Sequence, residues 1–159
     1  MMKVVRNSVF ETNSSSTHSL VYTRSMSLEE YVPKNSTIKV KFIDTDDETS
    51  LRTLADKVSY LVSHIVNDYK YNAATYDDLI EEVKNSWSFK KLNYYVEEHY
   101  NKSIVFPESY KGDLEEIVNI NHQLIESDFD SLCKDIVNED RDYLGEILSP
   151  DKSIDFGRD

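Results

Sequence analysis

Residues 51–69 read LRTLADKVSYLVSHIVNDY, and the spacing of apolar side chains in this stretch predicts one long helix. From Thr49 onward the apolar residues recur three or four positions apart, a spacing that places side chains on one face of an α-helix. The stripe consists of Leu51, Leu54, Val58, Leu61, Val62, Ile65, Val66 and Tyr69. We therefore expect an amphipathic helix of about five turns.

Further helices are predicted downstream. Thr75, followed three residues later by Asp78, is typical of a capped helix start, and Ser88 is predicted to cap the next helix. An apolar stripe predicts another helix over 128–137, and residues 141–148 are expected to form a last turn or two before Pro150.

The N-terminal third has a different pattern. In residues 37–43 Ile38, Val40 and Phe42 alternate with lysines, which predicts a half-buried strand. Val4-Val5 and residues 19–23 are the expected partners of this strand. A short helix with a serine cap is predicted over 27–31. Residues 104–106, before Pro107, are strand-like, and 113–125 could be helix or strand.

These elements predict an α+β fold in one domain spanning residues 1–159. Residues 1–43 are expected to form a small N-terminal sheet, and residues 44–159 a mainly helical, acidic remainder. The chain has only three glycines and three prolines, which argues against a turn-rich β-sandwich. A chain of 159 residues is long enough to bury a core without disulfides.

Charge is unevenly distributed along the chain. The net charge is +3 over residues 1–43, −5 over 44–107 and −10 over 108–159, which accounts for the total of −12. An acidic surface repels nucleic-acid phosphates, so direct nucleic-acid binding is disfavoured. Two interpretations remain: a solvated face that maintains solubility, or a surface that occupies the basic groove of a nucleic-acid-binding protein.

Cysteine usage and hydropathy indicate the compartment. The single cysteine, Cys133, excludes an intramolecular disulfide framework, and no run approaches the roughly 20 apolar residues that cross a bilayer. No signal-peptide pattern opens the chain. We expect a cytoplasmic protein that has no membrane segment.

The segment RNSVFETNSSSTHS, residues 6–19, is the richest in site chemistry. Its hydroxyls, amides and backbone N–H groups could hold phosphate or carboxylate oxygens, with Arg6 as a bidentate clamp. The predicted ligand-binding residues are Arg6, Asn13, Ser14, Ser15, Ser16, Thr17 and His18.

Two other interpretations of this segment stay open. In a nucleophilic one, His18 deprotonates a hydroxyl such as that of Ser16, and Glu11 orients the ring, but neighbours in sequence rarely converge in this way. In a structural one, the polar side chains bond to local backbone and build turns.

The same segment resembles the opening of a group of small proteins from bacteriophages, prophages and low-GC Gram-positive bacteria. The resemblance covers about the first twenty residues, and no activity follows from it. It implies a setting, phage biology inside a bacterial host cell, and no mechanism.

Other candidate sites have stronger structural explanations. The acidic string at 44–48 is expected to favour the start of the long helix. Asn138, Asp140 and Asp142 imitate part of a calcium loop, but Tyr143 stands where that loop needs glycine, so we predict no metal site. His64, His99, His122 and Cys133 have no ligand spacing, and the eleven tyrosines can complete a core or anchor an interface.

Two functional hypotheses follow. The first is a non-enzymatic, phage-type accessory protein that inhibits a host nucleic-acid-handling or defence protein with a basic surface. The second is a protein that sequesters or hydrolyses a nucleotide or another small anionic ligand through residues 6–19. No glycine-rich phosphate loop follows a strand, so no cofactor is expected. The first is favoured, because the sequence supplies only one cluster of possible catalytic groups.

Overall fold

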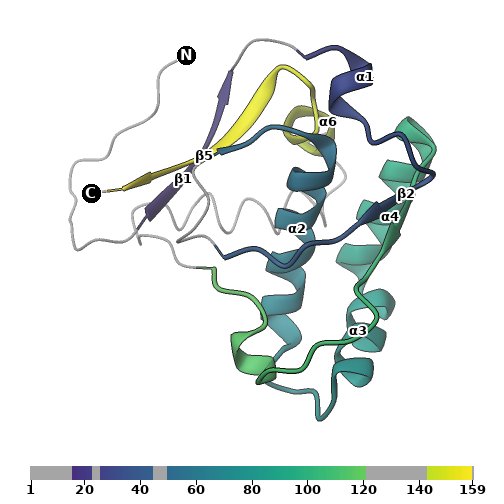
Figure 1. The fold of residues 1–159 in the computed structure, drawn as a ribbon, viewed down its shortest axis with the longest axis vertical. Helices are drawn as coiled ribbons and strands as arrows, with labels where there is room; N and C mark the ends of the chain where they lie inside the picture. The colour runs from purple at the N-terminus through teal and green to yellow at the C-terminus, as the bar shows by residue number, and fades with distance from the viewer. Residues whose placement is uncertain (1–15, 23–25, 45–49, 121–142, 159) are drawn as a thin grey trace.

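A computed structural model describes residues 16–22, 26–44, 50–120 and 143–158 (Figure 1). The predicted long helix is confirmed as α2, Leu54–Tyr69, at the centre of the fold. It begins later than expected because Ser50–Leu51 form a strand, β3, and Thr53 caps the helix by accepting a hydrogen bond from the Asp56 N–H.

The helix α2 is buried on more than one face, which differs from the amphipathic prediction. Its buried residues include the polar Lys57, Ser59, Ser63 and His64 besides the apolar stripe. The reason is its central position, since α2 packs against two other helices and a strand. A single apolar stripe predicts the helix but does not show that other structure covers it on several sides.

Two helices follow α2. The first, α3, spans Tyr76–Asn85 and begins at the predicted cap, where the Thr75 hydroxyl accepts from the Asp78 N–H at 3.1 Å. The second, α4, spans Trp87–Tyr100. The prediction that Ser88 caps α4 is wrong, because Ser86 accepts from the Phe89 N–H at 3.1 Å and Ser88 lies inside the helix. Asn101, with a positive φ of 57°, ends α4.

The predicted strand at 37–43 is confirmed in part as β2, Thr37–Lys39. Its partner is not N-terminal: β2 pairs in parallel with β4, Ser103–Val105, and the three helices form the crossover between them. A parallel pair needs such a long connection. Beyond β2 the alternation of buried and exposed residues ends at Lys41, because Phe42 is half-buried and Ile43 is buried. Ser59 and Ser63 of α2 accept hydrogen bonds from the N–H groups of Lys41 and Ile43.

The second sheet joins the two ends of the described chain. Its order is β1 (Ser16–Tyr22), β5 (Lys152–Arg158), β3, and all the pairs are antiparallel (Figure 1). The fold is therefore α+β as predicted, but its strands are not confined to residues 1–43. The expected pairing of residues 19–23 with β2 is wrong, since residues 16–22 pair with β5. Val4-Val5 lies outside the described residues.

Short helices complete the fold. The predicted helix with a serine cap is confirmed as α1, Leu28–Tyr31, and the last predicted turns as α6, Tyr143–Ile147. Residues 113–125 could be helix or strand by their sequence, and in the structure Leu114–Glu116 form a 3₁₀ turn, η1. The helix predicted over 128–137 lies outside the described residues.

Of the acidic string at 44–48, the structure describes Asp44, and the prediction that the string favours the start of the long helix is wrong for this residue. Asp44 forms a parallel bridge with Asn119 and accepts a hydrogen bond from the Asn119 side chain at 2.9 Å. Because β3 separates the string from α2, Asp44 is not part of the helix start. Residues 45–48 lie outside the described residues.

Candidate functional site

The polar segment 6–19 reaches the described part of the chain only at its end. Arg6, Glu11 and 13–15 lie outside the described residues, so their roles stay predictions. Ser16, Thr17 and His18 are in β1, at register positions opposite 156–158. These three residues are thus in an extended, paired strand, so the interpretation that they build turns is wrong for them, while their predicted ligand binding stays a prediction. The reason is β5, a strand that sequence reasoning did not anticipate.

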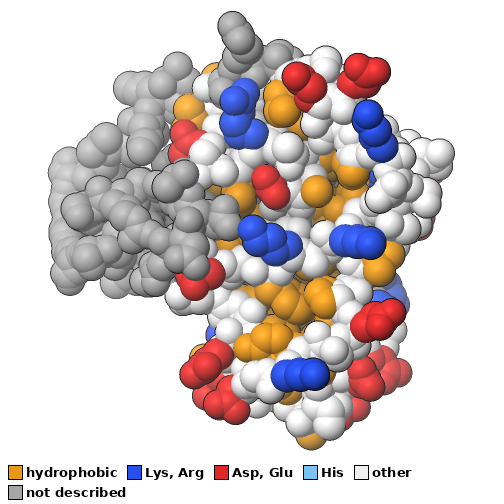
Figure 2. Space-filling view, in the orientation of Figure 1, with side chains coloured by type: hydrophobic (Ala, Val, Ile, Leu, Met, Phe, Trp, Pro, Cys, Tyr) orange, Lys and Arg blue, Asp and Glu red, His pale blue; other side chains and the backbone are white. Residues whose placement is uncertain are grey.

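The helix α3 carries an exposed acidic face. Asp77, Asp78, Glu81 and Glu82 are all exposed, and Figure 2 shows acidic side chains gathered over α3 at the lower right. In the described part of the chain, none of these carboxylates is recorded in an ion pair. Asp77 and Asp78 lie in the first turn, where carboxylates favour the helix start. The helix dipole does not explain Glu81 and Glu82, which lie beyond that turn.

Large aromatic side chains are exposed beside this face. Trp87 and Tyr94 are 67% and 65% exposed and lie seven residues apart on α4, which places them on the same side of the helix two turns apart. Tyr71, just before α3, is 66% exposed. Aromatic groups with a polar tip are the side chains that anchor protein interfaces most often.

A groove of about 520 Å³ lies between α3 and the chain from β4 to Glu108. Its apolar lining includes Ile80, Ile104 and Phe106, which are nearly buried, and Val105, which is 40% exposed. The Tyr76 hydroxyl donates to the Pro107 carbonyl at 2.5 Å and so ties α3 to the segment after β4. Burial raises the pKa of Tyr76 to about 12, with a smaller effect from Asp77, so this hydroxyl stays protonated and donating near neutral pH.

The groove has charged groups along its length. Asp77, Glu81 and Glu108 line it together with one cation, Lys84, whose ammonium lies 5.7 Å from the centroid of the Phe106 ring. That distance is within the range of a cation–π contact. The charged residues named here sum to −2, so the groove is acidic over an apolar and aromatic floor.

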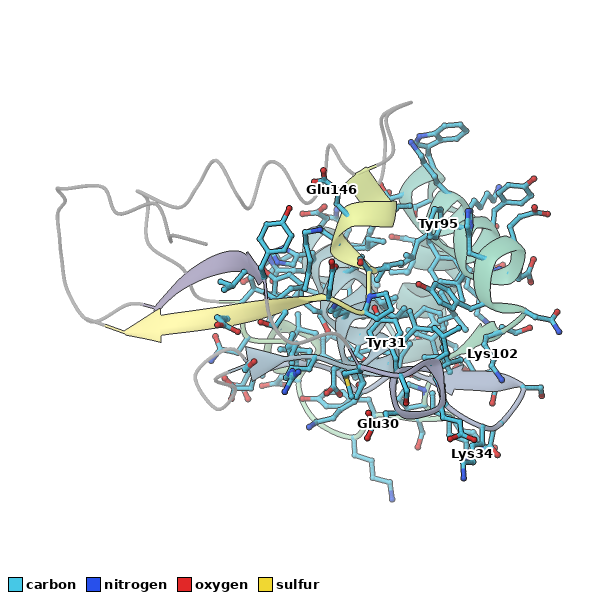
Figure 3. All side chains as sticks on the ribbon, turned by 90° about the horizontal axis from the view of Figure 1, so that it is seen from above. Glu30, Tyr31, Lys34, Tyr95, Lys102 and Glu146 are labelled. Atoms are coloured by element: carbon cyan, nitrogen blue, oxygen red, sulfur yellow. The ribbon has the colours of Figure 1, made fainter. Side chains whose placement is uncertain are left out.

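A second polar cluster lies inside the molecule, where α1, α2, α4 and the end of α6 meet. The Lys57 ammonium is completely buried and donates to the Ser149 carbonyl at 2.8 Å and to the Tyr31 hydroxyl at 3.3 Å. The hydroxyls of Tyr31 and Tyr100 both donate to the Leu148 carbonyl, the second at 2.9 Å. Figure 3 shows Tyr31 within the layer of side chains, away from its edge.

Burial perturbs the ionisable groups of this cluster. Desolvation lowers the pKa of Lys57 from 10.5 to about 7, and Asp151 opposes this shift. Desolvation also raises the pKa of Tyr31 and of Tyr100. A hydrogen bond from Ser149 is the main cause that lowers the pKa of Asp151.

The Lys57 cluster is structural. Helix C-termini leave carbonyl groups without an intrahelical partner, and the carbonyls of Leu148 and Ser149 follow α6 directly. Lys57, Tyr31 and Tyr100 bond to them and hold the end of α6 against three other helices. A buried amine that is bonded to a carbonyl oxygen does not face a substrate, so the low pKa of Lys57 is not by itself a catalytic signal.

The remaining predicted candidates have structural surroundings where they are described. His64 is buried, with its ring 4.6 Å from the Tyr60 ring, and His99 stacks on Tyr95 at 3.9 Å. Tyr31 and Tyr60 are completely buried and so complete the core, whereas Tyr71 and Tyr94 are exposed, and their predicted use as interface anchors stays a prediction. His122 and Cys133 lie outside the described residues.

Sequence reasoning missed the groove and the Lys57 cluster. The groove joins residues about 25 positions apart, and its only local signal was the exposed face of α3. The lysine gave a weak signal, because Lys57 lies three residues after Leu54 and four before Leu61, on the helix face that carries these two apolar residues.

Over the ranges that the structure describes, no helix combines the length and apolar character needed to span a membrane. Comparisons with protein-family models, with curated proteins and with solved structures find no match to this chain.

Proposed function

We propose that this protein is a non-enzymatic accessory protein that binds the basic surface of a partner protein through the acidic face of α3 and the exposed aromatic side chains beside it. The observation that carries the proposal is the exposed acidic pair Glu81 and Glu82, whose position neither helix capping nor the helix dipole explains. Complementary charge speeds association and selects the partner, while aromatic side chains supply contact area.

The class of partner follows from the same chemistry. Proteins that handle nucleic acid have basic surfaces, because they neutralise phosphates with lysine and arginine. Together with the phage-type opening segment, this favours a host nuclease or defence protein in the bacterial cytoplasm as the partner. Sequestration or hydrolysis of a nucleotide by residues 6–19 remains the alternative hypothesis.

The test compares two matched double variants. E81Q/E82Q removes two charges from α3, and E29Q/E30Q removes two from exposed positions on α1, a helix outside the proposed surface. Each protein is immobilised and exposed to bacterial extract at low and at high salt; the retained partner is identified, purified and titrated by calorimetry. Exposed charge pairs contribute about 0.2–1 kcal/mol each, so we expect E81Q/E82Q to weaken a stoichiometric complex by about threefold to tenfold.

The control E29Q/E30Q should bind as tightly as the natural protein. Equal affinity of all three proteins for the partner, or the lack of any stoichiometric partner at low salt, would overturn the proposal.

A further inference from the structure

The groove between α3 and β4 has two properties that select one kind of occupant. Its charged groups, Asp77, Glu81, Glu108 and Lys84, sum to −2, and its floor is apolar and aromatic. A cationic side chain with a long aliphatic stem satisfies both, because the stem packs on apolar atoms while the charged head reaches the carboxylates. Arginine and lysine have this form.

A contact between a cation and an aromatic ring is already present in the groove. The Lys84 ammonium lies over the Phe106 ring at 5.7 Å. The position over this ring is therefore favourable for a cation. A guanidinium stacks on an aromatic ring better than an ammonium does, so an incoming arginine can take this position from Lys84.

From these observations we propose that the groove is the anchor site for an arginine side chain of the partner, presented in an extended segment with an apolar neighbour. The guanidinium lies between Glu81 and the Phe106 ring, the apolar neighbour contacts Val105 and Ile80, and Lys84 swings away from the ring. This inference rests on the proposed function and names the part of the partner that α3 recognises.

The two charged side chains make opposite predictions. Glu81 attracts the arginine, so E81Q weakens binding. Lys84 repels and competes with it, so K84M, which keeps the aliphatic stem, strengthens binding. We expect a change of about threefold in each direction. If the arginine were bound only by an acidic surface without a defined groove, E81Q and E98Q would weaken binding equally, since both residues are exposed carboxylates on neighbouring helices.

The probe is the capped pentapeptide acetyl-Gly-Leu-Arg-Leu-Gly-amide, and its counterpart with Glu in place of Arg is the control. Each is titrated into the ¹⁵N-labelled full chain, and amide shifts are followed by NMR. The arginine peptide should shift signals of residues 76–85 and 104–108 saturably, more tightly in K84M, more weakly in E81Q and unchanged in E98Q. The glutamate peptide should shift none of them.

Failure of this inference can be told apart from failure of the proposed function. If the arginine peptide leaves the groove signals unmoved, or if K84M weakens its binding, the groove is not an arginine site, even where E81Q/E82Q weakens a protein partner. If the peptide binds as expected but no stoichiometric partner depends on α3, the groove assignment stands and the proposed function is wrong.

Discussion

Replacement of Lys57 by methionine should change how the stability of this protein depends on pH. Methionine has a similar length but no charge, so the side chain still fills its place between α1, α2 and the end of α6. The hydrogen bond from the ammonium to the Ser149 carbonyl is lost. We therefore expect K57M to change the slope of the free energy of unfolding against pH, in addition to its value at one pH.

The sign follows from the pKa of the amine in the two states. Burial lowers the pKa of Lys57 from 10.5 to about 7 in the folded protein. Between these values the unfolded chain binds a proton that the folded protein has released, so the free energy of unfolding rises with pH across this window. Below about pH 7 both states are protonated, and the cost of burying the charge is fully present.

The magnitude follows from the same difference. One pKa unit corresponds to about 1.4 kcal/mol, so the shift sets a ceiling of about 5 kcal/mol. Asp151 lies near the ammonium and is itself 45% exposed, which shows that the cluster lies close to solvent. Solvent screening reduces the effect, and we expect the difference in unfolding free energy between K57M and the natural protein to change by about 2 kcal/mol from about pH 6 to about pH 9.5.

The assay is urea denaturation followed by far-ultraviolet circular dichroism across this range. At the upper limit the tyrosines of the unfolded chain are still mainly protonated, because their ordinary pKa is about 10. K90M, at an exposed position on α4, is the matched control and should keep the slope of the natural protein. If K57M and the natural protein have parallel curves of stability against pH, Lys57 does not titrate in the folded state as argued here.

Three further outcomes are expected from the same denaturation assay. S86A should lower the free energy of unfolding by about 1–2 kcal/mol, because Ser86 caps α4. S88A, at the position predicted from the sequence, should lower it by less than half as much, and equal losses would contradict the assignment of the cap. I154A truncates a completely buried side chain of β5 and should lower the free energy of unfolding by about 2–4 kcal/mol, whereas V105A, at a partly exposed position, should lower it by less than about 1 kcal/mol. A mild effect of I154A would mean that β5 adds little to the core. Y100F should lower the free energy of unfolding by about 0.5–1 kcal/mol, because Tyr31 still donates to the Leu148 carbonyl in this variant. Y31F should lower it more, because Tyr31 also contacts Lys57, and the reverse order would refute the proposed hydrogen-bond network.

Elements with a strong local signal were predicted well. The caps of α1 and α3, the helical core of 54–69 and the alternation from Ile38 to Lys41 all depend on neighbours within a few residues. The cap of α4 was misplaced by two residues because Ser86 and Ser88 are both acceptable caps in sequence. Only the hydrogen bond to the Phe89 N–H distinguishes them.

The pairing of strands could not be predicted in the same way. Residues 16–22 were expected to join an N-terminal sheet, and they pair instead with β5, more than 130 positions away. The carboxylates of α3 lie close together in the sequence, within residues 77–82, but the groove beside them requires β4 to lie against α3. No periodicity within either segment specifies that contact.

The sequence by itself determined which segments form the longer helices of the described residues, where α1 and α3 begin, and the net charge of −12, because these properties depend on local hydrogen bonds, apolar spacing and residue type. Tertiary structure alone decided which strands pair, that α2 is buried around much of its circumference, and that Lys57 bonds to the carbonyl at the end of α6. Those features depend on groups far apart in the chain, and their free energy appears only when the whole chain has packed.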